Sequence, residues 1–130
     1  MSPPTVLVVD DDEGAVETLT DILTAKQYRV ESVRSGEEAI SRAGTTPFDA
    51  ILMDIVMPGI NGVEALRSIK AATPGAKVIM MTAYTRHELV EQAKKAKAVA
   101  VLPKPLDMDW LLALLARTVR KNGGSQGKSR

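Results

Sequence analysis

Cysteine is absent from this chain of 130 residues, and histidine occurs once, at His87. The absence of cysteine excludes disulfides, thiolate nucleophiles and cysteine metal sites, and a lone imidazole excludes any site that needs two, most zinc sites among them. No apolar run approaches the roughly 20 residues that a membrane span needs. The N-terminus has neither the basic start nor the apolar stretch of a signal peptide. We therefore expect a small cytoplasmic domain without a membrane contact.

The net charge of +1 is unevenly distributed. Residues 1–116 carry 12 Lys and Arg against 16 Asp and Glu, a net charge of −4, whereas residues 117–130 carry five cations and no acid. We predict an N-terminal extension at 1–4, one folded domain at 5–121 and a flexible basic tail at 122–130. The tail is interpreted as a solvated terminus or the start of a linker to another module. Nucleic-acid binding by the tail alone would be weak and unspecific, and no direct DNA binding is expected of the domain.

Four short apolar runs and one mixed run are the candidate strands. The apolar runs are continuous rather than alternating, which is typical of strands buried on both faces of a parallel sheet. The mixed run has the composition of an edge strand. In chain order the five are Val6–Val9, Tyr28–Val33, Ala50–Met53, Val78–Met81 and Ala98–Leu102.

Helical patterns with N-terminal capping signals lie between these runs. The signals are the capping-box spacings Ser35-x-x-Glu38 and Thr85-x-x-Glu88 and the N-cap residues Asn61 and Asp107. Strand and helix therefore alternate five times, which requires right-handed crossovers and a parallel sheet with helices on both faces. We predict an α/β fold, a single three-layer (βα)5 domain. The edge-like second strand favours the strand order 2-1-3-4-5.

Polar residues follow several of the strands, at the carboxyl edge where such sheets bind ligands. The first strand ends in an acidic run from Asp10 to Glu13, the third ends at Asp54, and the fourth ends at Thr82. The fifth runs into Lys104. Clustered carboxylates repel one another unless a cation intervenes, and Mg²⁺ takes oxygen ligands without cysteine or histidine. Carboxylate, hydroxyl and ammonium groups around such an ion indicate phosphoryl transfer onto an aspartate.

Four motifs stand in the same order and spacing as in a known family. They are Val8-Val9-Asp10-Asp11, Asp54-x-x-Met57-Pro58-Gly59, Thr82-Ala83 and Lys104-Pro105. Together they resemble the receiver domain of two-component response regulators over roughly residues 5–120. The resemblance implies a flavodoxin-like fold and a domain that works as a phosphorylation-controlled binding switch rather than as an enzyme acting on other molecules.

The resemblance assigns roles around the acidic cluster. It implies that Asp54 accepts a phosphoryl group from a phosphohistidine on a sensor histidine kinase or a histidine phosphotransfer protein. It also implies that Asp11 binds Mg²⁺ directly and Asp10 mainly through water, with Asp54 and the backbone carbonyl of Val56 completing the protein ligands. Asp12 is interpreted as a helix-capping acid or a solvated neighbour rather than as a ligand.

The same resemblance assigns roles on the other side of the site. Lys104 would pair with the phosphoryl group, Thr82 would hydrogen-bond it, and the peptide bond before Pro105 would be cis. The downstream partner would bind over residues 86–120, and a phosphorylation-dependent homodimer is a further possibility.

Three positions depart from the family pattern. Val101 stands where the family has a switch Tyr or Phe, and valine cannot swing a ring between buried and exposed states. Lys97 stands where a glycine is usual, so a positive φ there would strain the lysine. Val56 and Tyr84, two residues beyond Asp54 and Thr82, carry neither an acid nor an amide that could orient water. We therefore predict slow loss of the phosphoryl group.

Two other functions are consistent with parts of the sequence. Asp10-x-Asp12 is also the opening of Mg²⁺-dependent phosphatases that form an aspartyl phosphate, although the chain lacks the length for their cap. A phosphorylation-independent receiver-like interaction module is favoured by Val101 and disfavoured by the intact acidic cluster. A flavin or dinucleotide protein is disfavoured because no glycine-rich turn follows the first strand.

Overall fold

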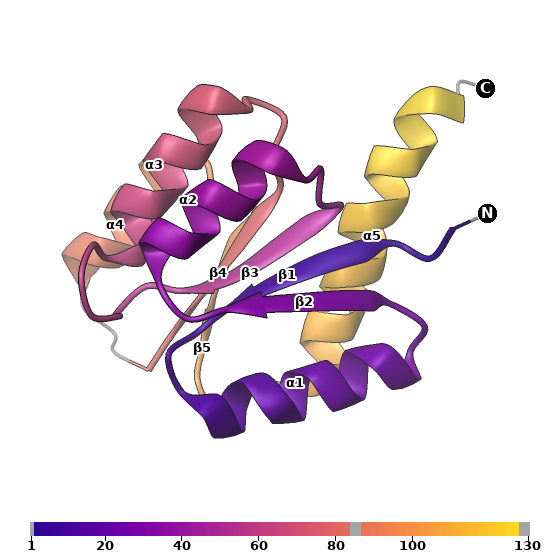
Figure 1. Ribbon diagram of the computed structural model, residues 1–130, viewed down its shortest axis with the longest axis horizontal. Helices are drawn as coiled ribbons and strands as arrows, with labels where there is room; N and C mark the ends of the chain where they lie inside the picture. The colour runs from indigo at the N-terminus through magenta and orange to yellow at the C-terminus, as the bar shows by residue number, and fades with distance from the viewer. Residues whose placement is uncertain (1, 84–86, 128–130) are drawn as a thin grey trace.

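The computed structural model describes residues 2–83 and 87–127, in which five strands alternate with five helices (Figure 1). The capping box expected at Thr85-x-x-Glu88 lies partly outside these residues. The elements are β1 (Thr5–Val9), α1 (Glu13–Ala25), β2 (Arg29–Val33), α2 (Gly36–Thr45), β3 (Ala50–Asp54), α3 (Gly62–Ala72), β4 (Val78–Thr82), α4 (His87–Lys95), β5 (Ala100–Pro103) and α5 (Met108–Gly127).

All four strand pairings are parallel, and the strand order is β2-β1-β3-β4-β5, as predicted. Helices α1 and α5 cover one face of the sheet and α2, α3 and α4 cover the other (Figure 1). Successive residues of a strand point to opposite faces, so Leu7 and Val9 join one core while Val6 and Val8 join the other. This two-sided burial explains why the central strands are continuous apolar runs.

The fifth strand begins two residues later than predicted, at Ala100 rather than Ala98. The amide of Ala98 donates to the carbonyl of Ala93 and so belongs to the end of α4. Lys97, which makes the turn, has φ = 70°. The condition under which the sequence analysis expects a strained lysine is therefore met, because the lysine occupies a conformation that favours glycine.

Side-chain caps begin most of the helices where the sequence predicts them. Asn61 caps α3 in a reciprocal capping box, and the carboxylate of Asp107 accepts from the amide of Trp110 at the start of α5. Ser35 caps α2 by accepting from the amide of Glu38, but the expected reciprocal bond is absent from this box. The Glu38 carboxylate instead accepts from the amide of Arg34, at 2.8 Å, because the extended backbone of Ser35 brings the preceding amide within reach.

Helix α5 extends to Gly127, which is beyond residue 121, the expected end of the folded domain. The described part of the expected tail at 122–130 is therefore helical, and the flexibility of that tail stays a prediction. No helix among residues 2–83 and 87–127 has both the length and the apolar character needed to cross a membrane.

Candidate functional site

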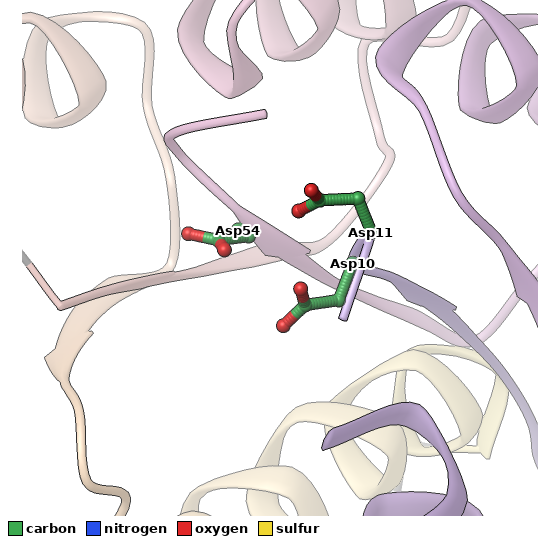
Figure 2. A group of neighbouring side chains, drawn as sticks. All are labelled: Asp10, Asp11 and Asp54. Carbon is green, nitrogen blue, oxygen red and sulfur yellow. The ribbon is translucent and has the colours of Figure 1, made fainter. Parts of the chain in front are cut away.

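Three carboxylates meet at the carboxyl edge of the sheet, where β1 and β3 lie side by side. Asp10 and Asp11 follow β1, and Asp54 is the last residue of β3. One oxygen from each lies within 4.8 Å of the others, and the side chains point into a common space (Figure 2). Asp10 is 1% exposed and Asp54 8%, whereas Asp11 is exposed to solvent. The strand ends thus bury two of the acids and leave the third accessible to a ligand.

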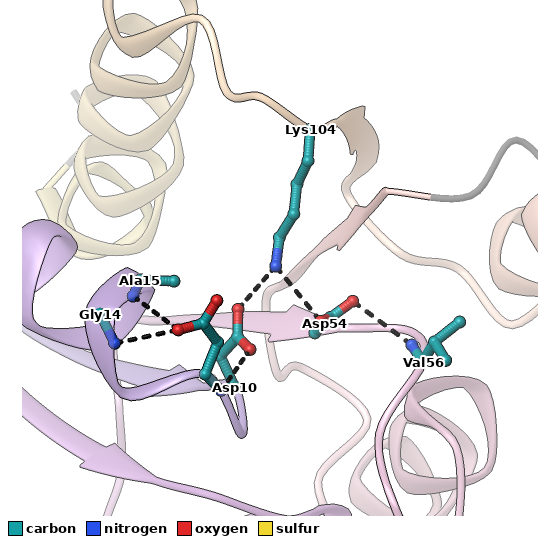
Figure 3. Close-up of polar contacts among 7 residues, drawn as sticks. Asp10, Gly14, Ala15, Asp54, Val56 and Lys104 are labelled. Atoms are coloured by element: carbon teal, nitrogen blue, oxygen red, sulfur yellow. Dashed lines mark hydrogen bonds and ion pairs between the residues drawn. The ribbon is translucent and has the colours of Figure 1, made fainter.

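Lys104 places its ammonium between two of these acids (Figure 3). Its Nζ lies 2.7 Å from Oδ2 of Asp10 and 3.2 Å from Oδ2 of Asp54. The backbone of Lys104 is fixed by a hydrogen bond from its amide to the carbonyl of Thr82, and its peptide bond to Pro105 is cis, as expected. The β5–α5 connection therefore presents the ammonium to the acidic edge of the sheet.

The electrostatics of the site follow from this shared cation. Burial raises the pKa of Asp54, Lys104 opposes the shift, and the charge of Asp10 adds to it, so the net pKa is above its usual value. Burial would lower the pKa of Lys104. Its hydrogen bond to Asp10 and the charges of Asp54 and Asp10 outweigh burial, so the pKa of Lys104 is raised. Asp54 is therefore a carboxylate whose negative charge is only partly compensated, and it favours an added cation.

The β3–α3 loop folds closely over the Asp54 side of the site. The amide of Val56 donates to Oδ1 of Asp54 at 3.3 Å, and the amide of Gly62 donates to the carbonyl of Ile55 at 2.7 Å. A Cβ on Gly62 would lie 2.3 Å from the carbonyl oxygen of Asp54, a distance that no side chain tolerates. Glycine at this position allows α3 to start directly against the end of β3.

Asp12 caps the N-terminus of α1 and is not one of the three clustered carboxylates. Its Oδ1 accepts from the amides of Gly14 and Ala15, at 3.0 and 3.3 Å. Its own amide donates to Oδ1 of Asp10. The interpretation of Asp12 as a helix-capping acid is confirmed, because its carboxylate caps the first turn of α1.

The donor set at this edge of the sheet fits a hard divalent cation. The three clustered side chains offer only carboxylate oxygens, and Mg²⁺ is typically bound by one or two carboxylates together with waters and phosphate oxygens. Exposed Asp11 leaves room for those further ligands. The residues that could hold the ion are thus Asp10, Asp11 and Asp54.

Comparison with known proteins assigns this arrangement to a family. A sequence model of the response regulator receiver domain matches residues 6–116, most of the chain. The chain belongs to the response regulator receiver domain family. It is thus the receiver domain of a two-component response regulator, as the four motifs predict.

Curated relatives and solved structures agree with this assignment. The receiver domain is 37% identical over 114 residues to the transcriptional regulatory protein ZraR of Escherichia coli K12, covering 88% of this chain and 26% of that protein. It is 36% identical over 108 residues to a response regulator receiver protein of Anaeromyxobacter, covering 83% and 45%. The chain thus spans between about a quarter and about half the length of the curated relatives it matches.

Two solved structures show the same fold. A CheY-like receiver domain protein of Methanospirillum hungatei superposes with a TM-score of 0.91 at 28% identity, over 95% of this chain and 99% of that one. The response regulator TrrA of Thermotoga maritima, solved in complex with Mg²⁺ and BeF, superposes with a TM-score of 0.81 at 30% identity, over 88% and 98%.

The remaining expected site residues differ in how the receiver domain holds them. Thr82 ends β4 and is 4% exposed. Val101 lies in β5, is half-buried and packs against the core on the α2–α4 face. Tyr84 lies outside the described residues. The carbonyl of Val56 belongs to the loop beside Asp54, and the side chain of Val56 is 38% exposed.

Sequence reasoning missed two contacts that shape the site. It anticipated Lys104 as a partner for an incoming anion and not its shorter contact with Asp10. It also missed Glu37, at the start of α2, whose carboxylate accepts from the amide of Ile60 at 3.4 Å and would lie 2.8 Å from a Cβ on Gly59. Neither contact has a local sequence signal, because each joins elements distant in the chain.

Proposed function

We propose that Asp54 accepts a phosphoryl group, with Mg²⁺, from a phosphohistidine on a sensor histidine kinase or a histidine phosphotransfer protein, and that phosphorylation controls what this receiver domain binds. The observation that carries the proposal is the position of Asp54 at the end of β3. There it lies within 4.8 Å of the carboxylates of Asp10 and Asp11 and 3.2 Å from the ammonium of Lys104. A nucleophile, a set of metal ligands and a cation thus share one edge of the sheet.

The transfer step follows from the groups around Asp54. A carboxylate oxygen of Asp54 attacks phosphorus, and the bond from phosphorus to the imidazole nitrogen breaks as the new bond forms. The electron pair of the broken bond remains on the imidazole nitrogen, and because the other ring nitrogen carries a proton, the ring leaves as neutral imidazole. The amide of Val56 holds Oδ1 of Asp54 in place, so the carboxylate is oriented before the donor arrives.

Other side chains would stabilise the transferred group. Mg²⁺, when bound, supplies positive charge to the phosphoryl oxygens. The ammonium of Lys104, already 3.2 Å from Asp54, would pair with the phosphoryl group, and the hydroxyl of Thr82, at the end of the neighbouring strand, would donate to it. The complex of TrrA with Mg²⁺ and BeF supports a metal at this site in the family.

A groove next to the site suits the partner that delivers the phosphoryl group. It has a volume of about 590 Å³ and runs between α1 and the β5–α5 connection. Asp10 and Lys104 line it, together with apolar side chains that include Leu19, Ile22 and Leu106. We propose that an amphipathic helix bearing the phosphohistidine packs here, because Asp10 and Lys104, which line the groove, lie beside Asp54.

The output of the domain would be binding rather than catalysis on another molecule. We propose that a downstream protein binds over residues 86–120. Val101 in place of the aromatic switch residue favours one second candidate, an interaction module that works without phosphorylation. The clustered acids and Lys104 favour the phosphorylated switch, because a plain interaction module does not need them.

The test is the intact mass of the wild type and of Asp54→Asn after incubation with Mg²⁺ and acetyl phosphate. We expect one phosphoryl group on the wild type, none without Mg²⁺ and none on the variant. No gain by a folded wild type would favour the interaction module. A gain that survives the substitution would show that another residue is the nucleophile.

A further inference from the structure

A second cavity lies away from the acidic edge, between the start of β5 and the later turns of α5. Its volume is about 480 Å³, and it is lined by Val99, Leu114, Arg117, Thr118 and Arg120, here named the α5 pocket. The side chain of Val99 is 39% exposed. The hydroxyl of Thr118 donates to the carbonyl of Leu114 and is occupied within α5. The pocket therefore has an aliphatic floor with two arginines on one side.

The apolar floor continues along α5 towards its N-terminus. Trp110 precedes Leu114 by four residues and Arg117 by seven, so the three lie on one face of the helix. Trp110 is 50% exposed. Exposed tryptophan and arginine are the residue types most enriched among the energetically dominant positions of protein interfaces. Leu114 and Arg117 line the α5 pocket, so this face of α5 presents both an aromatic ring and a basic edge to a partner.

The charged residues that line the α5 pocket are both cations. Arg117 and Arg120 lie on α5, and three exposed lysines lie at the end of α4 and in the turn before Val99: Lys94, Lys95 and Lys97. No acid occurs in residues 92–106 or 110–120. Among the described residues, only Lys94 of these five has an ion pair, a long one of 3.9 Å with Glu91. The two arginines that line the pocket therefore have no ion-pair partner among the described residues.

We infer that the α5 pocket and Trp110 bind an acidic segment of a partner protein, which inserts one aliphatic side chain between Val99 and Leu114. Carboxylates of the segment pair with Arg117 and Arg120, whose guanidinium groups bind carboxylates in bidentate geometry. This names the chemistry of the downstream partner and rests on the proposed function only for the role of this face in output.

The same observations disfavour two other occupants. A second copy of this chain in a two-fold symmetric pair brings the same patch against itself, so Arg117 and Arg120 would face cations and the pocket lining supplies no acid to pair with them. A nucleic acid is disfavoured because residues 1–116 carry a net charge of −4 and the floor of the pocket is aliphatic. An acidic protein segment with an apolar anchor complements both the charge and the floor.

The test uses the fluorescence of Trp110, which is the only tryptophan in the chain. The probe is a short synthetic peptide rich in glutamate, with one central leucine and no aromatic residue, titrated at low ionic strength into the unphosphorylated full chain. The test variant is Arg117→Glu/Arg120→Glu. The matched control is Lys26→Glu/Arg67→Glu, which makes the same charge change at exposed positions on α1–β2 and α3.

We expect the peptide to shift Trp110 emission and the test variant to weaken binding about tenfold or more, equivalent to roughly 1.4 kcal/mol. The control should change affinity by no more than about twofold, and glutamine in place of the central leucine should weaken binding. Equal losses in test and control variants would overturn the inference, as would no emission change with the leucine peptide.

Two further measurements separate the other occupants. Tighter binding of a single-stranded oligonucleotide of equal charge, lost in the test variant, would identify a nucleic-acid surface. A dimer in sedimentation of the free chain, abolished by the test variant, would identify a second copy. None of these measurements uses phosphorylation, so a failure here does not affect the role proposed for Asp54. A failure of phosphorylation likewise does not affect this binding surface.

Discussion

The ammonium of Lys104 lies 2.7 Å from Oδ2 of Asp10, although the two residues are 94 positions apart in the chain. The same ammonium is 3.2 Å from Asp54. The ammonium of Lys104 therefore lies closer to Asp10 than to Asp54, the proposed phosphoacceptor. This unequal sharing, together with burial, leaves Asp54 with a raised pKa and a negative charge that a metal ion would help to stabilise.

Neutralising Asp54 should stabilise the fold in Mg²⁺-free buffer. A carboxyl group with a raised pKa binds its proton more tightly in the folded chain, so its ionised form lowers the free energy of unfolding at neutral pH. We expect Asp54→Asn to increase that free energy by about 1 kcal/mol in urea titrations at pH 7 with EDTA.

The pH dependence distinguishes this cause from a general effect of asparagine. The advantage of Asp54→Asn should shrink as the pH falls through the raised pKa of Asp54, because the wild-type carboxyl then becomes neutral as well. An advantage that is constant between pH 7 and acidic pH, or a less stable variant at pH 7, would contradict the account.

Mg²⁺ should stabilise the wild type through exposed Asp11. A ligand that binds only the folded state adds about 1.4 kcal/mol for each tenfold excess over its dissociation constant. We expect the rise in melting temperature with MgCl₂ to be strongly reduced in Asp11→Asn. The neighbouring Asp12→Asn is the matched control, because asparagine also caps helices and Asp12 lies outside the carboxylate cluster. Equal Mg²⁺ responses in the two variants would refute the assignment.

A substitution of Gly62 should show that α3 begins too close to Asp54 for a side chain at this position. A Cβ there would lie 2.3 Å from the carbonyl oxygen of Asp54, whereas a Cβ on Gly75 meets nothing within 4 Å. We expect Gly62→Ala to lower the free energy of unfolding by about 2 kcal/mol or more, from backbone displacement. Gly75→Ala should change it by no more than about 0.5 kcal/mol. Urea denaturation of both variants checks the difference, and similar values would show that the loop adapts freely.

Replacing Lys97 by glycine should stabilise the domain. Its φ of 70° is in the left-handed region, which costs a residue with a side chain about 1–2 kcal/mol, although glycine loses more backbone entropy on folding. We expect Lys97→Gly to stabilise the domain by about 0.5 kcal/mol, and the helical control Gln92→Gly to destabilise it by about 1 kcal/mol. Thermal unfolding measures both, and a destabilised Lys97→Gly would show that the turn is not strained.

The phosphoryl group on the wild type should be long-lived. The side chain of Val56 is 38% exposed beside Asp54 and cannot orient a water molecule for attack. We expect decay over minutes or longer at 25 °C, followed by intact mass after removal of the donor, and faster decay in Val56→Glu. A wild-type half-life of seconds would show that another group orients water.

The layers and the site could be predicted because both follow from local pattern and topology. Strands buried on two faces are continuous apolar runs, and the ends of β1 and β3 meet because the sheet order makes them neighbours. Asp10 and Asp54 were thus placed together from the sequence. The positive φ of Lys97 was predictable because the family usually has glycine there.

The missed contacts depend on distances that no local pattern encodes. Glu38 has the spacing of a capping box, yet its carboxylate accepts from the amide of Arg34. Glu37 contacts the β3–α3 loop only because α2 and α3 pack together. The closer approach of Lys104 to Asp10 than to Asp54 depends on the course of the β5–α5 connection.

The most direct measurement locates the phosphoryl group on the chain. Borohydride reduces an acyl phosphate to an alcohol, so a phosphorylated aspartate becomes homoserine, which mass spectrometry of tryptic peptides detects. Trypsin separates Asp54, in peptide 43–67, from Asp10 and Asp11, in peptide 1–26. We expect homoserine at position 54 alone, and only after treatment with acetyl phosphate and Mg²⁺. Homoserine at position 10 or 11, or at none of the three in a folded protein, would contradict the account.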